Sequence, residues 1–374
     1  MVNGPSGKRR LLIAAVAVAV LGTGVAVIPS LLTPGEAPTS PVELSTEVRA
    51  AAAAAAASEE ELREALVAQI AAEPGSYSVT VRELDGAQRQ VSIDGELEHD
   101  PASMIKTFYA YAALHRVQQG ELNLDVALPS GVTLGDCLGV MIETSDNNCM
   151  ADIREFLGNE ALNTFFAEQG FPGTYTISDE AGVYVNKRTT TDDLAELLAR
   201  LENGELLDEE HGDILLSHLL RQAWRSKISS GLPEGVPSAT KSGYRPFDDG
   251  TAVEGDSAIV YAPDGTYVLA VIGTGATSPE AVRAISTTVY AHLSDTEVTP
   301  WIYPAQQYLA TTDVPYAREP GGSAVGVIPA GTLVELMYSD RVWFRLYDTN
   351  RYIWVLGSQL TLRPEYDYST VISG

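Results

Sequence analysis

The sequence is short of basic residues. Its 374 residues contain 24 Lys and Arg against 50 Asp and Glu, which gives a formal net charge of −26 at pH 7. Nucleic-acid binding relies on basic side chains that neutralise phosphates, so this composition excludes a nucleic-acid partner. We attribute the acidic excess to solubility. With 45% hydrophobic and 20% charged residues the chain can bury a sizeable core, and its length suggests about two or three domains.

Charged residues are also missing from one long stretch near the N-terminus. Residues 11–32 form a run of 22 residues without a charge, directly after the basic residues 8–10. An apolar run of this length can cross a bilayer, and a basic N-terminal flank places that end inside. We therefore expect a cytoplasmic tail over 1–10, a single-pass transmembrane helix over 11–32 and an extracytoplasmic remainder. A cleaved signal peptide and a secreted protein are the alternative.

Cysteine is scarce, because the chain has only Cys137 and Cys149. Neither lies near the apolar run, which excludes a lipoprotein anchor at that position. An exported protein meets an oxidising environment, so we expect a disulfide between the two. Two buried free thiols are the alternative.

What is present indicates a globular region behind a spacer. Residues 33–57 combine a Pro-, Ser- and Thr-rich linker with an alanine run, which is typical of a spacer that enters a helix. Two early strands, a series of helices, two late strands and a terminal helix are expected, over 77–83, 88–93, 100–114, 134–142, 149–157, 192–201, 212–225, 257–261, 267–273 and 279–293. Strands so far apart must pair, so the predicted fold class is α+β, with an antiparallel sheet and a helical insertion.

The predicted helix at 100–114 carries a chemical signal. Ser103 and Lys106 lie three positions apart, which places them on one face of a helix. A lysine amine that apolar neighbours partly desolvate loses its proton more easily and can activate a serine hydroxyl. The spacing alone is weak evidence, since Ser238 and Lys241 repeat it. At least one of the two pairs is therefore not a nucleophile pair.

Two further motifs follow Ser103, namely Ser145-Asp146-Asn147 and Lys241-Ser242-Gly243. Each alone fits a helix cap or a surface turn. Together and in this order they resemble the penicillin-recognising serine hydrolases, meaning class A β-lactamases and D-alanyl-D-alanine peptidases. The resemblance covers approximately residues 60–294, within a catalytic domain expected at 58–295. It implies an antiparallel sheet flanked by helices, with an all-helical subdomain.

The resemblance implies a role for each motif residue. Ser103 is the expected acylated nucleophile and Lys106 is its activating base. Ser145 is expected to pass a proton to the leaving nitrogen, with Lys241 beside it. The oxyanion hole is expected from the backbone N–H groups of Ser103 and Tyr244. We expect no metal and no cofactor. The residues implied in substrate binding are Asn147, Ser242, Gly243 and Tyr244.

The region that supplies deacylation in class A β-lactamases departs from the family pattern. That family carries a glutamate and an asparagine on a long loop, where they position the deacylating water. Residues 173–189 occupy this place here, and the loop is short. Its only carboxylates are Asp179 and Glu180, and Glu180 is the candidate base. We therefore expect acylation to outrun deacylation.

From Trp301 the chain changes to short β segments. Strands are expected over 332–338, 341–347 and 351–355, with polar turns between them. The stretch 326–360 resembles a bacterial SH3-like domain, which implies a small all-β barrel and a cell-wall ligand. The expected boundaries are a linker at 296–305, the SH3-like domain at 306–365 and a tail at 366–374.

These features predict a membrane-anchored serine hydrolase with an extracytoplasmic catalytic domain. Its expected substrates are β-lactams or the D-Ala-D-Ala-like peptide ends of peptidoglycan. The sequence does not separate β-lactam hydrolysis from slow, peptidase-like turnover. The alternative is a non-catalytic cell-wall peptidoglycan-binding protein, which the presence of every acylation residue disfavours.

Overall fold

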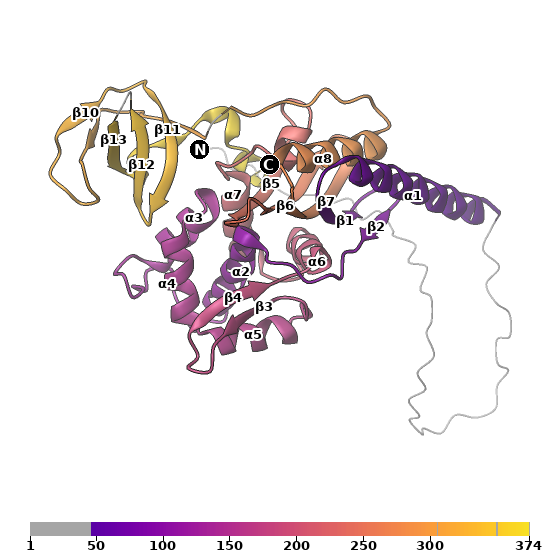
Figure 1. Cartoon of the computed structure of the whole chain (residues 1–374), viewed down its shortest axis with the longest axis horizontal. Coiled ribbons are helices and arrows are strands. Elements are labelled where there is room, and N and C mark those ends of the chain that lie inside the picture. The colour runs from indigo at the N-terminus through magenta and orange to yellow at the C-terminus, as the bar shows by residue number, and fades with distance from the viewer. Residues whose placement is uncertain (1–45, 305, 349–350, 374) are drawn as a thin grey trace, which may run out of the picture. The chain divides into compact units, whose positions relative to one another are not determined.

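The computed structural model describes residues 46–304, 306–348 and 351–373. The expected transmembrane segment at 11–32 lies outside these residues. Within the described ranges, no helix combines the length and the apolar character needed to cross a membrane. Figure 1 shows helices gathered around a sheet, with a run of strands at the C-terminal end of the chain.

The main sheet has five antiparallel strands in the order β2-β1-β7-β6-β5. β1 pairs with β7, so that Val79 faces Val271 across nearly two hundred positions of sequence. The predicted α+β class with an antiparallel sheet of distant strands is therefore confirmed. The strands are β1 Ser76–Glu83, β2 Gln90–Ile93, β5 Ser238–Pro246, β6 Ala252–Ala262 and β7 Gly265–Gly275.

Two helices cover one face of this sheet, α1 (Thr46–Ala72) and α8 (Pro279–Ser294). Leu62 and Leu66, one helical turn apart on α1, are fully buried in the same core as Val79 and Val271. Ser278 caps α8, since its side chain accepts a hydrogen bond from the backbone N–H of Ala281. The alanine-rich stretch expected as a spacer thus continues into the helix that packs on the sheet.

A cluster of helices lies on the other side of the sheet. Its centre is α2, in which the ten residues from Ile105 to Leu114 are all buried. A helix that is buried all round is a core helix, and this burial carries Lys106 into the interior. The cluster consists of α2 Ile105–Gln118, α3 Leu134–Glu143, α4 Asn147–Leu157, α5 Asn159–Glu168, α6 Thr191–Glu202 and α7 Glu209–Leu220.

Three sequence predictions in this region are wrong in detail. Helix α5 was not predicted, and the expected loop at 173–189 contains a hairpin of β3 (Tyr175–Ser178) and β4 (Tyr184–Arg188). Helix α7 ends at Leu220, although the pattern predicted a helix to residue 225. The reason is that Gln222 and Ala223 donate hydrogen bonds to the last carbonyls of α3 instead of continuing the helix.

The C-terminal residues form a separate β unit with its own core. A five-stranded sheet has the order β13-β12-β11-β8-β14, and β9 and β10 form a second pair. The residues expected as linker and tail pack inward, because Tyr303 and Tyr366 are buried and their rings meet edge to face. The SH3-like assignment stays a prediction. The strands are β8 Gln307–Leu309, β9 Val314–Tyr316, β10 Gly326–Ile328, β11 Leu333–Asp340, β12 Trp343–Asp348, β13 Arg351–Leu356 and β14 Thr361–Leu362.

Candidate active site

Ser103 lies in a short 3-10 turn, Ala102–Met104, that leads directly into α2. Asp100 shapes this turn, since its Oδ1 accepts a hydrogen bond of 2.8 Å from the backbone N–H of Ala102. Ala102 has a φ of 47°, in the left-handed region that side chains rarely adopt. Such strain persists only where the surroundings hold it, and it is concentrated at functional sites.

Two glycines of the sheet allow the turn to approach. Gly243 on β5 and Gly255 on β6 face each other across the sheet. A Cβ on Gly243 would lie 2.9 Å from the Pro101 carbonyl oxygen, and one on Gly255 would lie 2.4 Å from Met104 Cε. The Gly in Lys241-Ser242-Gly243 is therefore required for packing of the sheet against the serine turn.

Lys106 is fully buried and lies among four oxygen atoms. Its Nζ is 3.0 Å from Ser103 Oγ, 2.6 Å from the Ser145 carbonyl oxygen, 3.1 Å from Ser145 Oγ and 2.8 Å from Asn147 Oδ1. The two carbonyl-type oxygens can only accept hydrogen bonds. A neutral amine would donate its two hydrogens to them, which leaves its lone pair to accept the hydroxyl proton of Ser103.

Electrostatics favour that neutral form. Burial lowers the pKa of Lys106 well below its ordinary value, and the nearby positive charge of Lys241 lowers it further, while the carboxylate of Asp146 opposes the shift. Burial also lowers the pKa of Lys241, to about 7. Asp256 opposes that shift and Lys227 adds to it. Two buried amines thus share one site, and the positive charge of Lys241 favours proton loss from Lys106.

Ser145 lies in the turn between α3 and α4 and has a φ of 63°. Its Oγ accepts hydrogen bonds from both lysines, at 3.1 Å from Lys106 Nζ and 3.0 Å from Lys241 Nζ. The next residue, Asp146, caps α4 by accepting a hydrogen bond of 2.6 Å from the backbone N–H of Cys149. Asn147 is the first residue of α4, so the helix start fixes its side chain beside Lys106.

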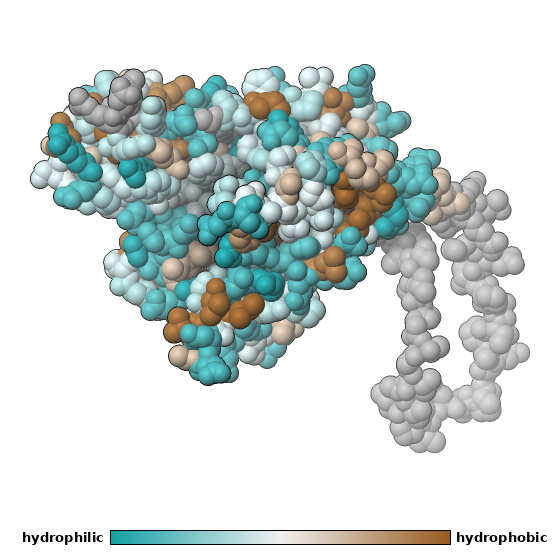
Figure 2. Space-filling view, viewed as in Figure 1, coloured by the Kyte–Doolittle hydropathy of each residue, from teal (hydrophilic) through white to brown (hydrophobic). Residues whose placement is uncertain are grey.

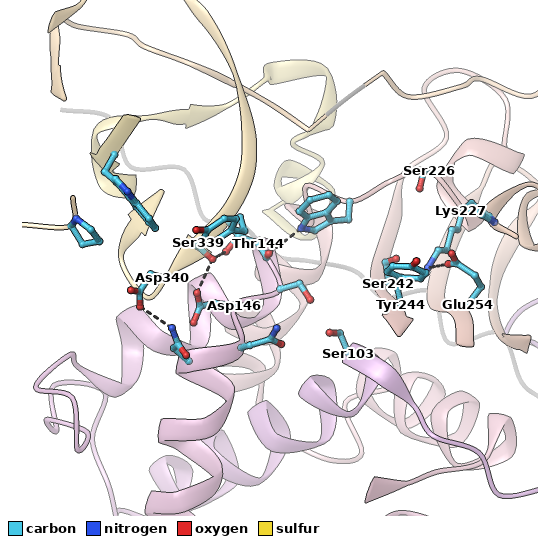
Figure 3. A pocket seen from close by; sticks show the side chains of 18 residues that line it. Ser103, Thr144, Asp146, Ser226, Lys227, Ser242, Tyr244, Glu254, Ser339 and Asp340 are labelled. Carbon is cyan, nitrogen blue, oxygen red and sulfur yellow. Dashed lines mark hydrogen bonds and ion pairs between the residues drawn. The ribbon is translucent and has the colours of Figure 1, made fainter. Parts of the chain in front are cut away.

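A cleft of about 790 Å³ opens over these groups. Ser103, Ser145, Asn147, Ser242 and Tyr244 line it, and the Tyr244 side chain is 58% exposed. Figure 3 shows Ser103 between Ser242 and Tyr244 on one side and Ser339 and Asp340 on the other. The sequence missed the contribution of the C-terminal unit, which no motif signals, namely Pro320, Tyr338, Ser339, Asp340 and Trp354.

Glu180 does not line the cleft. It is exposed in the turn between β3 and β4, next to the exposed side chains of Val183 and Val185. Figure 2 shows apolar side chains gathered on the surface over this hairpin. The structure therefore brings together the acylation residues of the sequence prediction and leaves the predicted deacylation base outside.

The carboxylates that do line the cleft are engaged elsewhere. Asp146 is bound by backbone and hydroxyl donors, and Glu254 forms an ion pair of 2.6 Å with Lys227. Asp340 Oδ1 accepts a hydrogen bond of 2.8 Å from the Asn148 amide. Among the cleft residues that the structure describes, each carboxylate thus already has a donor.

The two cysteines are bonded to each other. Cys137 on α3 and Cys149 on α4 form a disulfide that spans 12 positions and encloses the Ser145 turn. Both residues are fully buried in the helical core. The covalent link therefore fixes the two helices that bear this turn.

Comparison with known proteins agrees with this arrangement. A model of the beta-lactamase enzyme family matches residues 59–293, which is more than half of the chain. The chain belongs to this family. It is a serine hydrolase of the β-lactamase type, which confirms the enzyme class predicted from the three motifs. The match ends before the C-terminal β unit begins. No curated protein sequence matches the chain significantly.

Solved structures show where the family fold extends. TLA-1 extended-spectrum β-lactamase is 18% identical with a TM-score of 0.58, and covers 63% of this chain and 99% of its own. PBP-A is 24% identical with a TM-score of 0.56, over 63% of this chain and 97% of its own. A β-lactamase from Sphaerobacter thermophilus is 20% identical with a TM-score of 0.55, over 63% and 98%. At these identities the likeness establishes the β-lactamase fold.

Proposed function

We propose that this β-lactamase-family enzyme is of the class A type and is acylated at Ser103 by β-lactams or by D-Ala-D-Ala-like peptide ends. The observation that carries the proposal is the distance of 3.0 Å between Ser103 Oγ and the buried Lys106 Nζ, whose pKa is lowered. A nucleophile with an adjacent, deprotonated base is the arrangement that acyl transfer requires.

In the acylation step, neutral Lys106 takes the proton of Ser103 as Oγ attacks the carbonyl carbon of the substrate amide. The developing oxyanion lies where the backbone N–H groups of Ser103 and Tyr244 donate hydrogen bonds to it. The carbonyl oxygen of Ser145 and the Asn147 amide oxygen keep the lone pair of Lys106 directed at Ser103. Lys241 and Ser242 bind the substrate carboxylate.

The leaving nitrogen needs a proton before the amide bond can break. Lys241 donates a hydrogen bond to Ser145 Oγ, and Lys106 can do so once it carries the proton of Ser103, so the hydrogen of Ser145 is free to be donated to that nitrogen. Lys106, protonated in the first step, then returns a proton to Ser145. The leaving nitrogen thus receives the hydrogen of Ser145, the proton of Ser103 passes through Lys106 to Ser145, and the site is left with an ester on Ser103.

We further propose that this ester is hydrolysed slowly. A base for deacylation must lie within hydrogen-bond reach of the attacking water. Glu180 is outside the cleft, and the carboxylates in the cleft each have a donor already. Peptidase-like behaviour with a long-lived adduct is therefore favoured over fast β-lactam hydrolysis.

Intact-mass spectra after addition of excess benzylpenicillin test this proposal. We expect one penicilloyl adduct per chain that persists for minutes, while most of the drug remains intact. Glu180→Gln is the matched control and should leave the adduct lifetime unchanged. Unmodified enzyme together with consumed drug would contradict slow turnover. No adduct and no consumption would contradict acylation itself.

We also propose a location and a role for the flanking regions. The uncharged run at 11–32 after a basic flank supports a single-pass anchor with the catalytic domain outside, and a disulfide fits an oxidising compartment. The C-terminal β unit fits the proposed SH3-like barrel in having short strands and a core of its own. Binding of purified peptidoglycan by the full chain, compared with a chain that ends at residue 295, tests a wall ligand.

A further inference from the structure

The C-terminal unit contacts the turn that carries Ser145. Ser339 Oγ, at the end of β11, lies 2.8 Å from Thr144 Oγ1 and donates a hydrogen bond of 2.8 Å to Asp146 Oδ2. The backbone N–H of Arg341 donates a second one of 2.9 Å to the same oxygen. These contacts join residues nearly two hundred positions apart. Figure 3 shows the hydrogen bond between Ser339 and Asp146.

A second set of contacts fastens the first turns of α4. The Arg341 guanidinium pairs with both carboxylate oxygens of Asp152, at 2.7 Å from Nε and 3.2 Å from Nη2. Paired, bidentate bonds of this kind fix both direction and distance. The Asn148 amide donates to Asp340 Oδ1 at 2.8 Å. Three consecutive residues, from the end of β11 into the turn before β12, therefore bind α4 and the turn before it.

The turn needs such support. Ser145 has a left-handed backbone without being glycine, which is unfavourable and requires neighbours to hold it. Its carbonyl oxygen and its Oγ both bind Lys106 Nζ. Asp146 holds the turn at both oxygens, since one caps α4 and the other accepts from the C-terminal unit.

We propose that Ser339 and Arg341 are positioning residues for acylation, which act on Ser145 through Asp146. The C-terminal unit is then part of the catalytic machinery, and not only an appended binding module. Both residues lie beyond the family match at 59–293. The matches to the solved structures TLA-1, PBP-A and the Sphaerobacter thermophilus enzyme cover 97–99% of those chains but 63% of this one. More than a third of this chain therefore has no counterpart in those structures.

The inference rests on the proposed acylation of Ser103, and stopped-flow acylation by a fluorescent penicillin tests it. We expect Ser339→Ala to lower the acylation rate constant by roughly tenfold, because a bond to a charged group is lost, with the half-saturating concentration within about twofold. Arg341→Ala should act likewise, and Arg341→Lys should recover part of the rate. The matched controls are Ser358→Ala, at an exposed serine of the same unit, and Arg363→Ala, whose partners Glu365 and Gln307 lie in that unit.

The outcomes distinguish the positioning role of Ser339 and Arg341 from the proposed acylation of Ser103. Thermal unfolding identifies variants that are folded at the assay temperature, and only these are compared. Folded Ser339→Ala and Arg341→Ala proteins with wild-type rate constants would overturn the positioning role. Equal losses in the two controls would overturn it as well. A wild-type chain that is not acylated at all would instead contradict the proposed function.

An independent observation concerns the wall of the cleft. Tyr338 and Trp354 line it, and their rings meet edge to face with centroids 5.6 Å apart. The Arg345 guanidinium lies over both rings, 5.2 Å and 5.8 Å from their centroids, and bonds to the Tyr338 hydroxyl. Tyr338 is 42% exposed. The C-terminal unit therefore presents a braced aromatic surface within the same cleft as Ser103.

The position of this surface indicates what it binds. Ser242 of the proposed carboxylate site lies on one side of Ser103, and Ser339 and Asp340 of the C-terminal unit lie on the other (Figure 3). A cleft of about 790 Å³ is near the upper end of the range for small-molecule sites. A substrate that reaches both sides must extend past the reacting amide. We propose that Tyr338 and Trp354 form a subsite for the N-acyl side chain of the acyl donor, which is the peptide portion of a natural substrate.

Two penicillins that share one ring system test this subsite. For 6-aminopenicillanic acid, which lacks an N-acyl group, we expect Tyr338→Ala to change the second-order acylation constant by less than about twofold. For piperacillin, whose N-acyl group is long and aromatic, we expect a loss of roughly tenfold, the worth of one good aromatic contact. Tyr338→Phe keeps the ring and should match the wild type. Tyr347→Ala is the control, since Tyr347 is exposed on the same unit away from the cleft.

The test compares how much Tyr338→Ala lowers the second-order acylation constant for piperacillin and for 6-aminopenicillanic acid. Equal effects on both drugs, or none on either, would overturn the subsite. Trp354→Phe serves as a second variant if Tyr338→Ala does not fold, and it should narrow the preference for piperacillin. Failure of 6-aminopenicillanic acid to acylate the wild type would point to the proposed function and not to the subsite.

Discussion

The molecule contains the same serine-to-lysine spacing twice, and the two copies differ in their secondary structure and in the distance between serine and lysine. Ser103 and Lys106 lie at a helix start, where three positions make nearly one turn and bring Oγ to 3.0 Å from Nζ. Ser238 and Lys241 lie on β5, where three positions place side chains on opposite faces. Ser238 bonds to Ser229 Oγ at 2.8 Å instead.

The difference shows that the secondary structure decides whether a serine and a lysine three positions apart can contact each other. On the strand, Lys241 is separated from its own serine and turned to Ser145 of another motif, at 3.0 Å. On the helix, Lys106 reaches both Ser103 and Ser145. The two lysines therefore meet at one hydroxyl, although their serines lie apart. Changes to each pair should have unlike effects.

The largest expected effect is at the serines. Ser103→Ala should abolish labelling by a fluorescent penicillin, because the attacking oxygen is removed. Ser238→Ala should keep labelling and lose only about 1–3 kcal/mol of stability, from its buried hydrogen bonds to Ser229 and Arg225. Gel fluorescence and thermal unfolding of both variants make the comparison. Labelling that survives Ser103→Ala would remove that residue as nucleophile.

The next effect is at the base. Lys106→Ala should lower the acylation rate constant by roughly 10²–10⁴-fold, the range for loss of a positioned acid or base. The fold should persist with a loss of about 1–3 kcal/mol, since the Ser145 carbonyl oxygen and Asn147 Oδ1 lose a buried donor. Stopped-flow acylation and circular dichroism measure the two properties. Near-normal acylation of a folded Lys106→Ala protein would contradict the assignment.

A smaller effect is expected at the disulfide, which encloses the turn where both lysines meet. Replacing Cys137 and Cys149 by serine should lower the free energy of unfolding by about 3 kcal/mol, from the restored freedom of a short loop. Urea unfolding of the variant and the parent measures it. Two thiols that titrate in protein purified without reductant would show that the bond does not form.

The smallest effect distinguishes the lysines by pH. The pKa of Lys241 is lowered to about 7, so this amine is positive below pH 7 and neutral above it. The half-saturating concentration for a penicillin carboxylate should therefore rise about fivefold from pH 7 to pH 8, as the charged fraction falls. Lys241→Arg stays charged and should lack this rise. A wild type whose binding is flat over this range would contradict the assigned pKa.

Sequence alone predicted the α+β class and the antiparallel sheet of distant strands, and these predictions are confirmed because apolar periodicity is a local signal. The structure also brings together the four residues that the motifs assign to acylation, and their roles stay a prediction. The sequence did not predict α5, the β3–β4 hairpin or the end of α7 at Leu220, where tertiary hydrogen bonds replace the next helical turn.

The candidate active site shows most clearly which features the sequence determined and which depended on tertiary structure. The sequence determined that Ser103 and Lys106 share a helix face, because a spacing of three needs only the helix period. Tertiary structure alone decided that Lys241 contacts Ser145 and that Glu180 lies outside the cleft. It also decided that the C-terminal unit forms one wall of the cleft. Ser339 and Arg341 hold Asp146 from nearly two hundred positions away. No local pattern encodes such contacts, because they arise only when separate cores pack against each other.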